Sequence, residues 1–427
     1  MKYGFAGVRR AGSRAVAAGM IAAASASVNA VPLTMDEALA LAERANPTLR
    51  AAQAQLDAAR GRLEDSRSLL WNNPQLTAER TRRDVPPPTD FAERQREWAA
   101  GLAQTFEVAG QRGYRRDAAE AALAATTADV AEIRRQVRAE VGQQFYRVLA
   151  LQQRVALETQ AQALFDRAAE VVEKRRAAGE DSRLDANVAA VEAERARNQL
   201  AVSREQLGEA RTELAARLQL PADRVAEVTG SLDPEPPSYT LEALLQAATS
   251  RPRLQSLAAR EQAAQNRLSL ERASVYPDVT LGLTVGREGP IEAREKVTTL
   301  SLSLPLPLFK RNAAGIGQAS TDLTQARIDR QAGERDTRAQ IAALWQKLQS
   351  LSARVARLRD TVLPALEDNL RLSARAHQAG EIGLLQLLVV NRQALDARRD
   401  ALEAMADLKV TRLALEHAAG WSERGTP

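Results

Sequence analysis

The sequence contains no cysteine and only two histidines among its 427 residues. The absence of cysteine excludes a disulfide framework, a thiolate metal site and lipid attachment to a cysteine after an export signal. The two histidines, His377 and His417, are too few to build a histidine metal cage. Aromatic residues make up only 4% of the chain, whereas Ala, Leu, Arg, Glu and Gln are abundant, which is typical of long helices packed through small side chains.

The chain also lacks a strong charge of one sign over most of its length. Its formal net charge is +5, but Lys2, Arg9, Arg10 and Arg14 supply four positive charges within residues 1–30, where no acidic residue occurs. The rest of the chain therefore carries a net charge of only +1. Such a balance gives no electrostatic reason to expect a nucleic acid as partner.

No apolar run is long enough to form a transmembrane helix. The longest candidate, Ala15–Ala24, follows a basic stretch and precedes small residues, which is the order of regions in a secretory signal peptide. We therefore expect residues 1–30 to be a signal peptide, cleaved after Ala26 or Ala30, rather than a disordered cytosolic tail. The mature protein would then be periplasmic or lie in the outer membrane.

What the chain does contain is an internal duplication. Its first copy has Glu37-Ala38-Leu39 and then Asn46-Pro47, and its second copy has Glu242-Ala243-Leu244 and then Arg251-Pro252. Ala178-Gly179-Glu180 likewise matches Ala379-Gly380-Glu381. Solenoid repeats are only about 20–50 residues long, so this is a duplicated half. We expect a first repeat over 31–231, a proline-rich linker over 232–239, a second repeat over 240–420 and a tail over 421–427.

Each repeat reads as two helices, two strands and a long helical hairpin. In the first repeat Thr34 and Glu37 have the spacing of a capping box, and Pro47 begins a second helix expected to end near Leu70. The strands are expected at about 75–82 and 95–106, and the hairpin at about 113–219. A stripe of apolar residues recurs along that hairpin at three- and four-residue spacing: Ile133, Val137, Val141, Phe145, Val148, Leu151 and Val155.

The second repeat has strands expected at about 278–286 and 297–308 and a hairpin at about 314–418. Leucines alternate with small or proline residues as far as Leu308. The long helix of this hairpin has a coiled-coil seam from Ile341 to Val362, and Pro364, which interrupts the seam, is expected to kink the helix or mark a junction. A helix of some 60 residues would be on the order of 90 Å long, which no compact globular domain accommodates.

The strands have one apolar and one polar face, and two interpretations are open. They form either a half-buried sheet on a helical layer or a transmembrane barrel wall with a polar lumen. Four strands cannot close a barrel and their edges cannot stay unpaired in lipid, so the second, favoured interpretation requires several chains. The candidate lipid-facing residues are Val279, Leu281, Leu283, Val285, Leu300, Leu302 and Leu304.

No catalytic or metal-binding pattern is present in the sequence. It has no nucleophile elbow, no phosphate-binding loop and no metal-ligand spacing. We interpret His377 as a solvated residue near a hairpin tip and His417 as a helix-end residue favoured by the helix dipole. The chain is therefore not expected to be an enzyme or to need a cofactor. A soluble periplasmic coiled-coil adaptor or adhesin rod remains the alternative from another class.

Two strand-to-helix junctions carry a resemblance to a known family. The segment Gln104-Thr105-Phe106-Glu107-Val108-Ala109-Gly110-Gln111-Arg112 and its counterpart Leu304-Pro305-Leu306-Pro307-Leu308-Phe309-Lys310-Arg311-Asn312 resemble those of TolC-type outer-membrane efflux proteins. The similarity is to the heavy-metal resistance-nodulation-division branch, the CzcC-like proteins. Pro364-Ala365 and the stretch Leu384–Asn391 resemble the second hairpin of that family, so the resemblance covers the mature chain.

The resemblance implies a mainly α fold with membrane β-structure. Three chains would each give four strands to one twelve-stranded barrel and two long hairpins to a periplasmic tunnel. The protein would be a passive duct that contacts a periplasmic adaptor and a proton-driven inner-membrane pump. Metal cations are the implied cargo, with drugs or polypeptides of a type I secretion route as alternatives.

The resemblance also implies that the hairpin tips close the tunnel entrance and contact the adaptor. Around the two tips lie the candidate residues Gly179, Glu180, Asp181, Arg183, Asp185, Gly380 and Glu381. Both glycines are expected to end a helix in the left-handed conformation. Carboxylates repeated around a symmetric ring favour cations, and Asp185 is the gate residue to test. The second tip, Gly383 to Val390, has no aspartate, so it departs from the aspartate gate of better-known ducts.

Overall fold

A computed structural model describes residues 32–85, 93–221, 227–235, 237–289 and 293–421. The expected signal peptide lies outside these residues, as does all but the first residue of the expected C-terminal tail. Within the described ranges, no helix is both long enough and apolar enough to cross a membrane.

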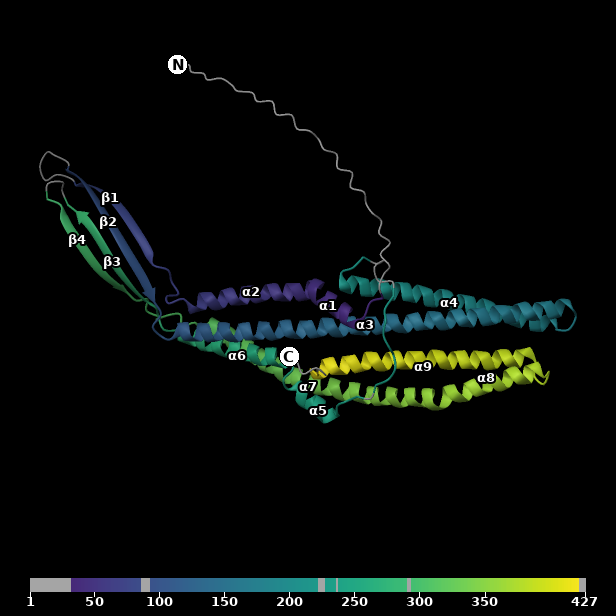
Figure 1. The fold of residues 1–427 in the computed structure, drawn as a ribbon. Coiled ribbons are helices and arrows are strands. Elements are labelled where there is room, and N and C mark those ends of the chain that lie inside the picture. The colour runs from purple at the N-terminus through teal and green to yellow at the C-terminus, as the bar shows by residue number, and fades with distance from the viewer. Residues whose placement is uncertain (1–31, 86–92, 222–226, 236, 290–292, 422–427) are drawn as a thin grey trace, which may run out of the picture.

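The two repeats have the same order of elements. In the first repeat these are α1 (Met35–Ala45), α2 (Pro47–Arg67), β1 (Gln75–Val85), β2 (Glu93–Phe106), α3 (Gln111–Ala177) and α4 (Arg183–Leu218). The second has α5 (Leu241–Ala248), α6 (Pro252–Ala273), β3 (Val279–Glu288), β4 (Glu295–Ser303), α7 (Ala313–Arg357), the π-helical turn η2 (Leu358–Val362), α8 (Leu363–Gln378) and α9 (Leu384–Ala419). Figure 1 shows an elongated molecule with the sheet at one end and the tips of the hairpins at the other.

The first helices begin where the sequence predicts. The Thr34 backbone N–H donates to Glu37 Oε2 at 2.9 Å, and the Glu37 N–H donates to Thr34 Oγ1 at 3.4 Å, so the capping box is confirmed. Pro47 begins α2, where its missing N–H leaves no helical bond unmade. This helix ends at Arg67 rather than near Leu70, because the Ser68 N–H turns back to Asp65 O.

The long helix of the first repeat is continuous, whereas that of the second is interrupted. Helix α3 extends for 67 residues, but α7 ends after 45 residues and is followed by η2. There the Leu363 N–H donates to Leu358 O, five residues back, and Pro364 follows with no N–H to donate. The predicted junction at Pro364 is therefore confirmed, and its cause is a shift to π-helical bonding.

The sheet is antiparallel in the order β1-β2-β3-β4, and its centre joins the two repeats. Strand β2 pairs with β3 from Phe106↔Val279 to Trp98↔Arg287. Strand β4 pairs only with β3, and β1 only with β2, within the described residues. The sheet is thus shared by both halves, with one edge strand from each.

The predicted fourth strand is too long. It was expected to reach Leu308 and to include Leu304, but β4 ends at Ser303. Pro305 and Pro307 have no N–H for a strand ladder, so pairing stops before them. The alternation of leucine beyond Ser303 therefore belongs to an irregular connection, and Leu304 is not a strand residue.

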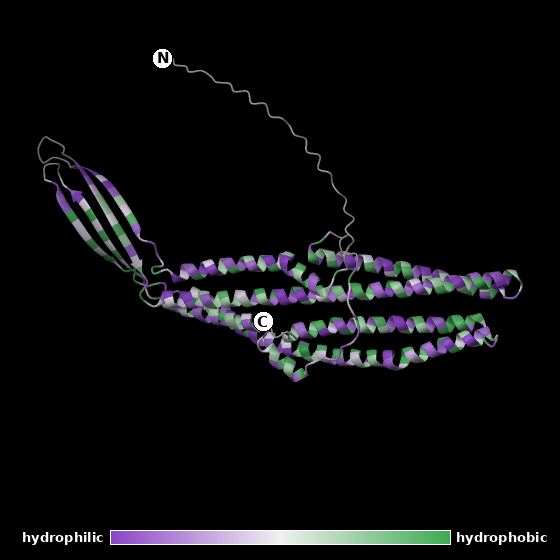
Figure 2. Cartoon of the chain, viewed as in Figure 1, coloured by the Kyte–Doolittle hydropathy of each residue, from purple (hydrophilic) through white to green (hydrophobic). Residues whose placement is uncertain are grey.

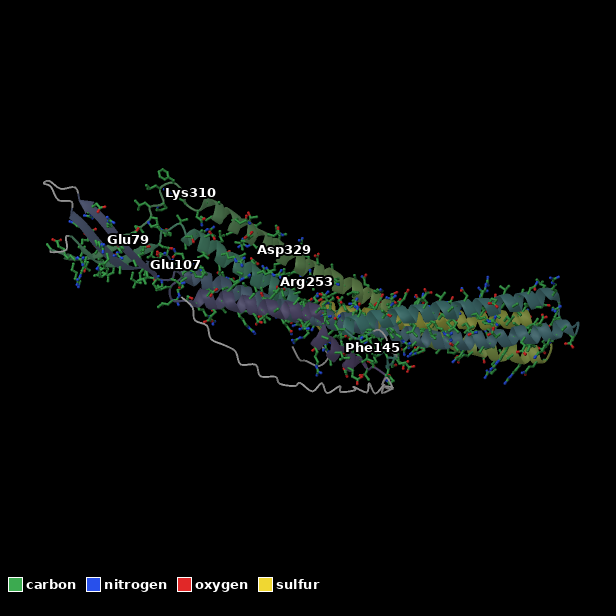
Figure 3. All side chains as sticks on the ribbon, turned by 90° about the horizontal axis from the view of Figure 1, so that it is seen from above. Glu79, Glu107, Phe145, Arg253, Lys310 and Asp329 are labelled. Atoms are coloured by element: carbon green, nitrogen blue, oxygen red, sulfur yellow. The ribbon has the colours of Figure 1, made fainter. Side chains whose placement is uncertain are left out.

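The helices are packed along the predicted apolar stripes. Val137, Val141, Phe145 and Val148 of α3 are buried against Ala38 and Ala42 of α1 and Leu214 of α4. In the second repeat Ile341, Leu348 and Val355 of α7 are buried with Leu415 of α9. Phe145 lies in the middle of the helical part, far from the sheet (Figure 3).

Candidate functional site: a strand wall and two helical tips

The four strands place their large apolar side chains on one face. The register pairs Leu281 with Leu302 and Leu283 with both Leu300 and Leu102, so these residues share a face. The other members of that face include Leu76, Trp98, Val279 and Val285. Leu300 is 79% exposed and Leu302 is 70% exposed, so no other described residue covers this face at β4. Figure 2 shows the resulting alternation of hydrophobic and hydrophilic residues along the strands.

The opposite face of the sheet carries small and polar side chains. Thr105 Oγ1 and Thr280 Oγ1 are hydrogen-bonded at 2.9 Å across β2 and β3. A Cβ atom added to Gly101 would lie 2.7 Å from Thr284 Oγ1, and one added to Gly282 would lie 2.5 Å from Ser301 Oγ. Glycine is therefore required at these two positions for neighbouring hydroxyl side chains to fit on this face.

Of the predicted lipid-facing residues, six lie in strands on the apolar face, and Leu304 lies beyond the strand. An exposed apolar face of this size on a soluble monomer would be a binding or aggregation surface. Contact of the face with lipid stays a prediction. The edges of the sheet support the same prediction. Strands β1 and β4 each present a row of unpaired backbone groups that requires a partner strand.

The two hairpin tips have matching backbones. Gly179 and Gly380 both have φ of 77°, as predicted for glycines that end long helices. The Glu180 N–H donates to Arg175 O at 2.9 Å, and the Glu381 N–H donates to Ala376 O at 2.9 Å. These bonds satisfy the last carbonyl groups of α3 and α8, so the duplication preserves the turn.

The charges of the first tip are largely paired within the tip. Arg175 Nε lies 3.5 Å from Glu180 Oε2 and 3.2 Å from Asp181 Oδ2. Asp185 accepts hydrogen bonds from the Ser182 N–H at 3.2 Å and the Ser182 hydroxyl at 2.6 Å, forming a capping box at the start of α4. Arg183 is exposed. The sequence did not show that Asp185 has this structural role.

The second tip has the same backbone turn as the first but different side-chain contacts. Gly383 occupies the N-cap position of α9 and offers no side-chain cap. His377 Nδ1 lies 3.1 Å from Ile382 O, so the imidazole joins the end of α8 to the loop. The prediction of a solvated histidine is therefore incomplete, since one ring nitrogen is engaged. Glu381 is exposed, beside the loop.

A buried ion pair joins the hairpins of the two repeats. The Glu158 side chain on α3 is completely buried, and Arg399 Nε of α9 donates to its Oε1 at 2.8 Å. This hydrogen bond raises the pKa of the Arg399 guanidinium above its usual range. An outer contact, 3.4 Å between Arg392 Nη1 and Glu192 Oε1, joins α9 to α4. Sequence patterns did not reveal either contact.

A second polar cluster lies where α6 begins. The buried guanidinium of Arg251 donates to Glu132 of α3, with Nε 3.1 Å from Oε1, and to Ala418 O at 3.0 Å. His417 Nε2 lies 3.8 Å from Glu132 Oε1. Burial lowers the pKa of His417, and Arg251 and Arg135 lower it further although Glu132 opposes them. His417 lies in the last turn of α9, as predicted, and the shift favours its uncharged form.

These polar groups form no recognisable metal site. No group of three or more His, Asp or Glu side chains is placed to hold a metal ion in the described part of the chain. The arrangement offers instead a two-faced sheet with open edges and long hairpins that extend from it.

Comparison with known proteins agrees with this arrangement. The family model described as "outer membrane efflux protein" matches residues 38–218 and again 243–421, one match for each repeat. The cobalt-zinc-cadmium resistance protein CzcC of Cupriavidus metallidurans is 29% identical over 369 residues, which cover 86% of this chain and 85% of that protein.

Solved structures of similar proteins share the fold. The structure of CusC, from a study of transmembrane channel formation, has a TM-score of 0.74 at 18% identity and covers 92% of this chain and 93% of CusC. The outer membrane protein VceC of Vibrio cholerae has a TM-score of 0.76 at 21% identity, covering 91% and 96%. The MtrE outer membrane channel of Neisseria gonorrhoeae, in its open state, has a TM-score of 0.72 at 17% identity, covering 91% and 89%.

Proposed function

Because the chain belongs to the outer membrane efflux protein family, we propose that it is the outer-membrane exit duct of a tripartite efflux system. The observation that carries the proposal is the sheet with one exposed apolar face, one face of threonine, serine and glycine, and two unpaired edges. In a membrane such a sheet requires closure with further strands. The family is one of transport proteins, and the duct performs no chemistry of its own.

Closure is achieved when β4 of one copy pairs with β1 of the next. Membership of this family supports three copies, each of which would contribute four strands to one twelve-stranded barrel. The hairpins would then form a tunnel on the periplasmic side. Cargo moves passively through it, and the energy comes from a proton-driven inner-membrane pump joined to the duct by a periplasmic adaptor.

The first test is extraction and conductance. The protein should leave outer-membrane fractions only in detergent, migrate as a trimer and conduct ions in planar bilayers. Release by osmotic shock as a soluble monomer would contradict the barrel. The matched variant Leu302→Arg should lower the amount of trimer, while Ser303→Arg on the opposite face should not.

We further propose metal cations as the cargo. The support is the similarity over most of the chain to a protein named for cobalt, zinc and cadmium resistance. A strain without this chain should become sensitive to one or more of these cations and should recover when the chain is restored. Unchanged metal tolerance together with increased sensitivity to drugs, or with loss of a secreted polypeptide, would contradict metal cations as the cargo. It would not contradict the proposed duct.

The entrance is proposed to lie at the two tips, with Asp185 among its charges. Asp185→Asn removes the charge but keeps a side-chain oxygen for the Ser182 hydrogen bonds. Ser182→Ala has the opposite effect, since it removes the cap and keeps the charge. If Asp185 lines the constriction, the asparagine variant should lose cation preference in bilayers and the Ser182→Ala variant should keep it. Equal behaviour of both variants would remove Asp185 from the gate.

A further inference from the structure

The connection between β4 and α7 is longer and more apolar than the duplication requires. Nine residues separate these elements, whereas only four, 107–110, separate β2 from α3. We call residues Leu304–Arg311 the junction segment. Leu304, Leu306 and Leu308 are exposed, and the Phe309 side chain is 97% exposed. Four large exposed apolar side chains within eight residues, which no other described residue covers, are typical of a surface that binds a partner.

The junction segment is held in place at both ends. Ser303 is paired with Thr280 of β3, and the Asn312 side chain donates to Glu271 O at 3.0 Å and to Glu271 Oε2 at 2.6 Å. Between these points the Leu308 N–H donates to Leu306 O at 2.9 Å, which forms a tight turn centred on Pro307. The apolar side chains therefore project from a defined backbone.

At the same end of the sheet, each of the other connections to helices carries at least one large exposed apolar residue. Examples are Trp71 before β1, Val108 after β2 and Tyr276 before β3, which are 50–64% exposed. Together with Phe309 they mark one level of the molecule, at the boundary between sheet and helices. Aromatic residues gather at this level in membrane barrels, because their rings fit the zone between hydrocarbon and water.

Two basic residues follow the apolar ones. Both side chains, Lys310 and Arg311, are exposed. Figure 3 shows Lys310 at the end of the helices nearest the sheet. The chain thus passes from the leucines of the sheet face through Phe309 to two cations. This is the order of environments met on leaving the hydrocarbon of a bilayer for its headgroups.

We propose that the junction segment is a lipid-binding anchor at the periplasmic surface of the outer membrane. The leucines and Phe309 insert at the edge of the acyl chains, and Lys310 and Arg311 bind the headgroups of anionic phospholipids. The inference rests on the proposed membrane duct. It adds to it a specific surface and partner, which would fix the height of the barrel in the bilayer.

The absence of cysteine makes a direct test available. A single nitroxide label can be attached at Phe309→Cys, and matched labels at Leu302→Cys on the sheet face and Leu184→Cys at the first tip provide references for lipid and for water. The labelled trimers are reconstituted into vesicles of phosphatidylethanolamine and phosphatidylglycerol. Access of oxygen and of a water-soluble nickel chelate is then measured for each label. Phe309→Cys should lie between the two references in depth.

The other outcomes separate failure of the anchor from failure of the duct. The anchor alone is overturned if the label at Phe309→Cys is as accessible to the nickel chelate as the label at Leu184→Cys while the label at Leu302→Cys stays in lipid. A label closed to both reagents indicates contact with a second copy and also overturns it. If Leu302→Cys is open to nickel as well, the proposed function itself fails.

The charges are tested separately by lipid preference. Lys310→Gln and Arg311→Gln should together reduce the preference of the trimer for spin-labelled phosphatidylglycerol over phosphatidylcholine, by roughly fivefold for each charge removed. Lys347→Gln, in the last third of α7 and far from the sheet, is the control and should leave this preference unchanged. An unchanged preference in the double variant would overturn the headgroup contact.

Discussion

The two repeats have one backbone plan and two sets of side-chain contacts. At the start of α2 the Asn46 side chain accepts hydrogen bonds from the Thr48 and Leu49 N–H groups. At the matching position before α6 stands Arg251, whose guanidinium instead reaches Glu132 of the first repeat. The comparison shows that the second repeat gives up a local helix cap and gains a contact between the halves.

The hairpins differ in the same sense. The first hairpin is built on an unbroken helix, α3, and its tip is capped by Ser182 at the start of α4. The second has a π-turn, no side-chain cap at Gly383 and an α8 without a fully buried residue. It is held through α9, which contacts α3 and α4 of the first repeat. Contacts with the first repeat therefore support the second hairpin, which has fewer local caps of its own.

The largest expected effect comes from breaking that support. Arg399→Ala leaves the Glu158 carboxylate buried without its main partner, and we expect a loss of about 3–5 kcal/mol in the free energy of unfolding. Replacing both residues by leucine should recover most of the loss. Denaturant unfolding in detergent measures both changes.

The control for this variant is Arg392→Ala, which removes an exposed contact with Glu192 and should cost less than about 1 kcal/mol. Equal losses for Arg399→Ala and Arg392→Ala would show that the buried pair does not hold the hairpins together.

The next effect concerns the sheet that both repeats share. Leu302→Arg should cost roughly 2–4 kcal/mol if its face meets lipid near the bilayer centre, because a buried guanidinium is costly there. Ser303→Arg points to the other face and should assemble normally. Trimer yield in the outer membrane gives the comparison, and equal yields would contradict the assigned faces.

A smaller loss of stability, equal in the two repeats, is expected when the glycine at each hairpin tip is replaced by alanine. Gly179→Ala and Gly380→Ala should each cost about 1–2 kcal/mol, because both positions have φ of 77° and an added Cβ meets no atom within 4 Å. Backbone strain alone is then responsible. Gly208→Ala inside α4 is the control and should be stabilising by about 0.5–1 kcal/mol. Unequal losses at the tips, measured by thermal unfolding, would show that the turns are not equivalent.

The smallest changes in stability are expected from helix capping, which differs between the two tips. Ser182→Ala should cost about 1 kcal/mol because α4 loses its cap, whereas Gly383→Ser should stabilise α9 by a few tenths of this amount, about 0.3 kcal/mol. Position 383 has an extended backbone, and an added Cβ there meets no atom within 4 Å. Hydrogen exchange at the two helix starts reports both changes, and a destabilised α9 would contradict the capping interpretation.

Local patterns predicted the elements well where one physical cause dominates. The capping box at Thr34, the glycine turns at Gly179 and Gly380 and the break at Pro364 each follow from a few neighbouring residues. The end of β4 was wrong, because alternation of leucine was given more weight than the missing N–H groups of Pro305 and Pro307.

The contacts between repeats were missed because they join residues far apart in the sequence. Glu158 and Arg399 are separated by 241 positions, and no local pattern pairs them. One signal was present, since Glu158 continues the apolar stripe of α3 after Val155 at three-residue spacing. A carboxylate in such a stripe must be buried with a partner. The candidate tip residues lie at the two turns, and their role in a gate stays a prediction, whereas the pairing of Asp185 with Ser182 in a capping box was not predicted.

The unlike edges of the sheet have a consequence for heredity. In the proposed barrel β1 of one copy pairs with β4 of the next, so the contact is head to tail and ends only by closing a ring. One chain with a blocked edge would then disable every ring it enters. In a cell with equal amounts of sound and edge-defective chains, roughly an eighth of three-membered rings would contain only sound copies. Such alleles would be dominant, whereas alleles that prevent folding altogether would be recessive.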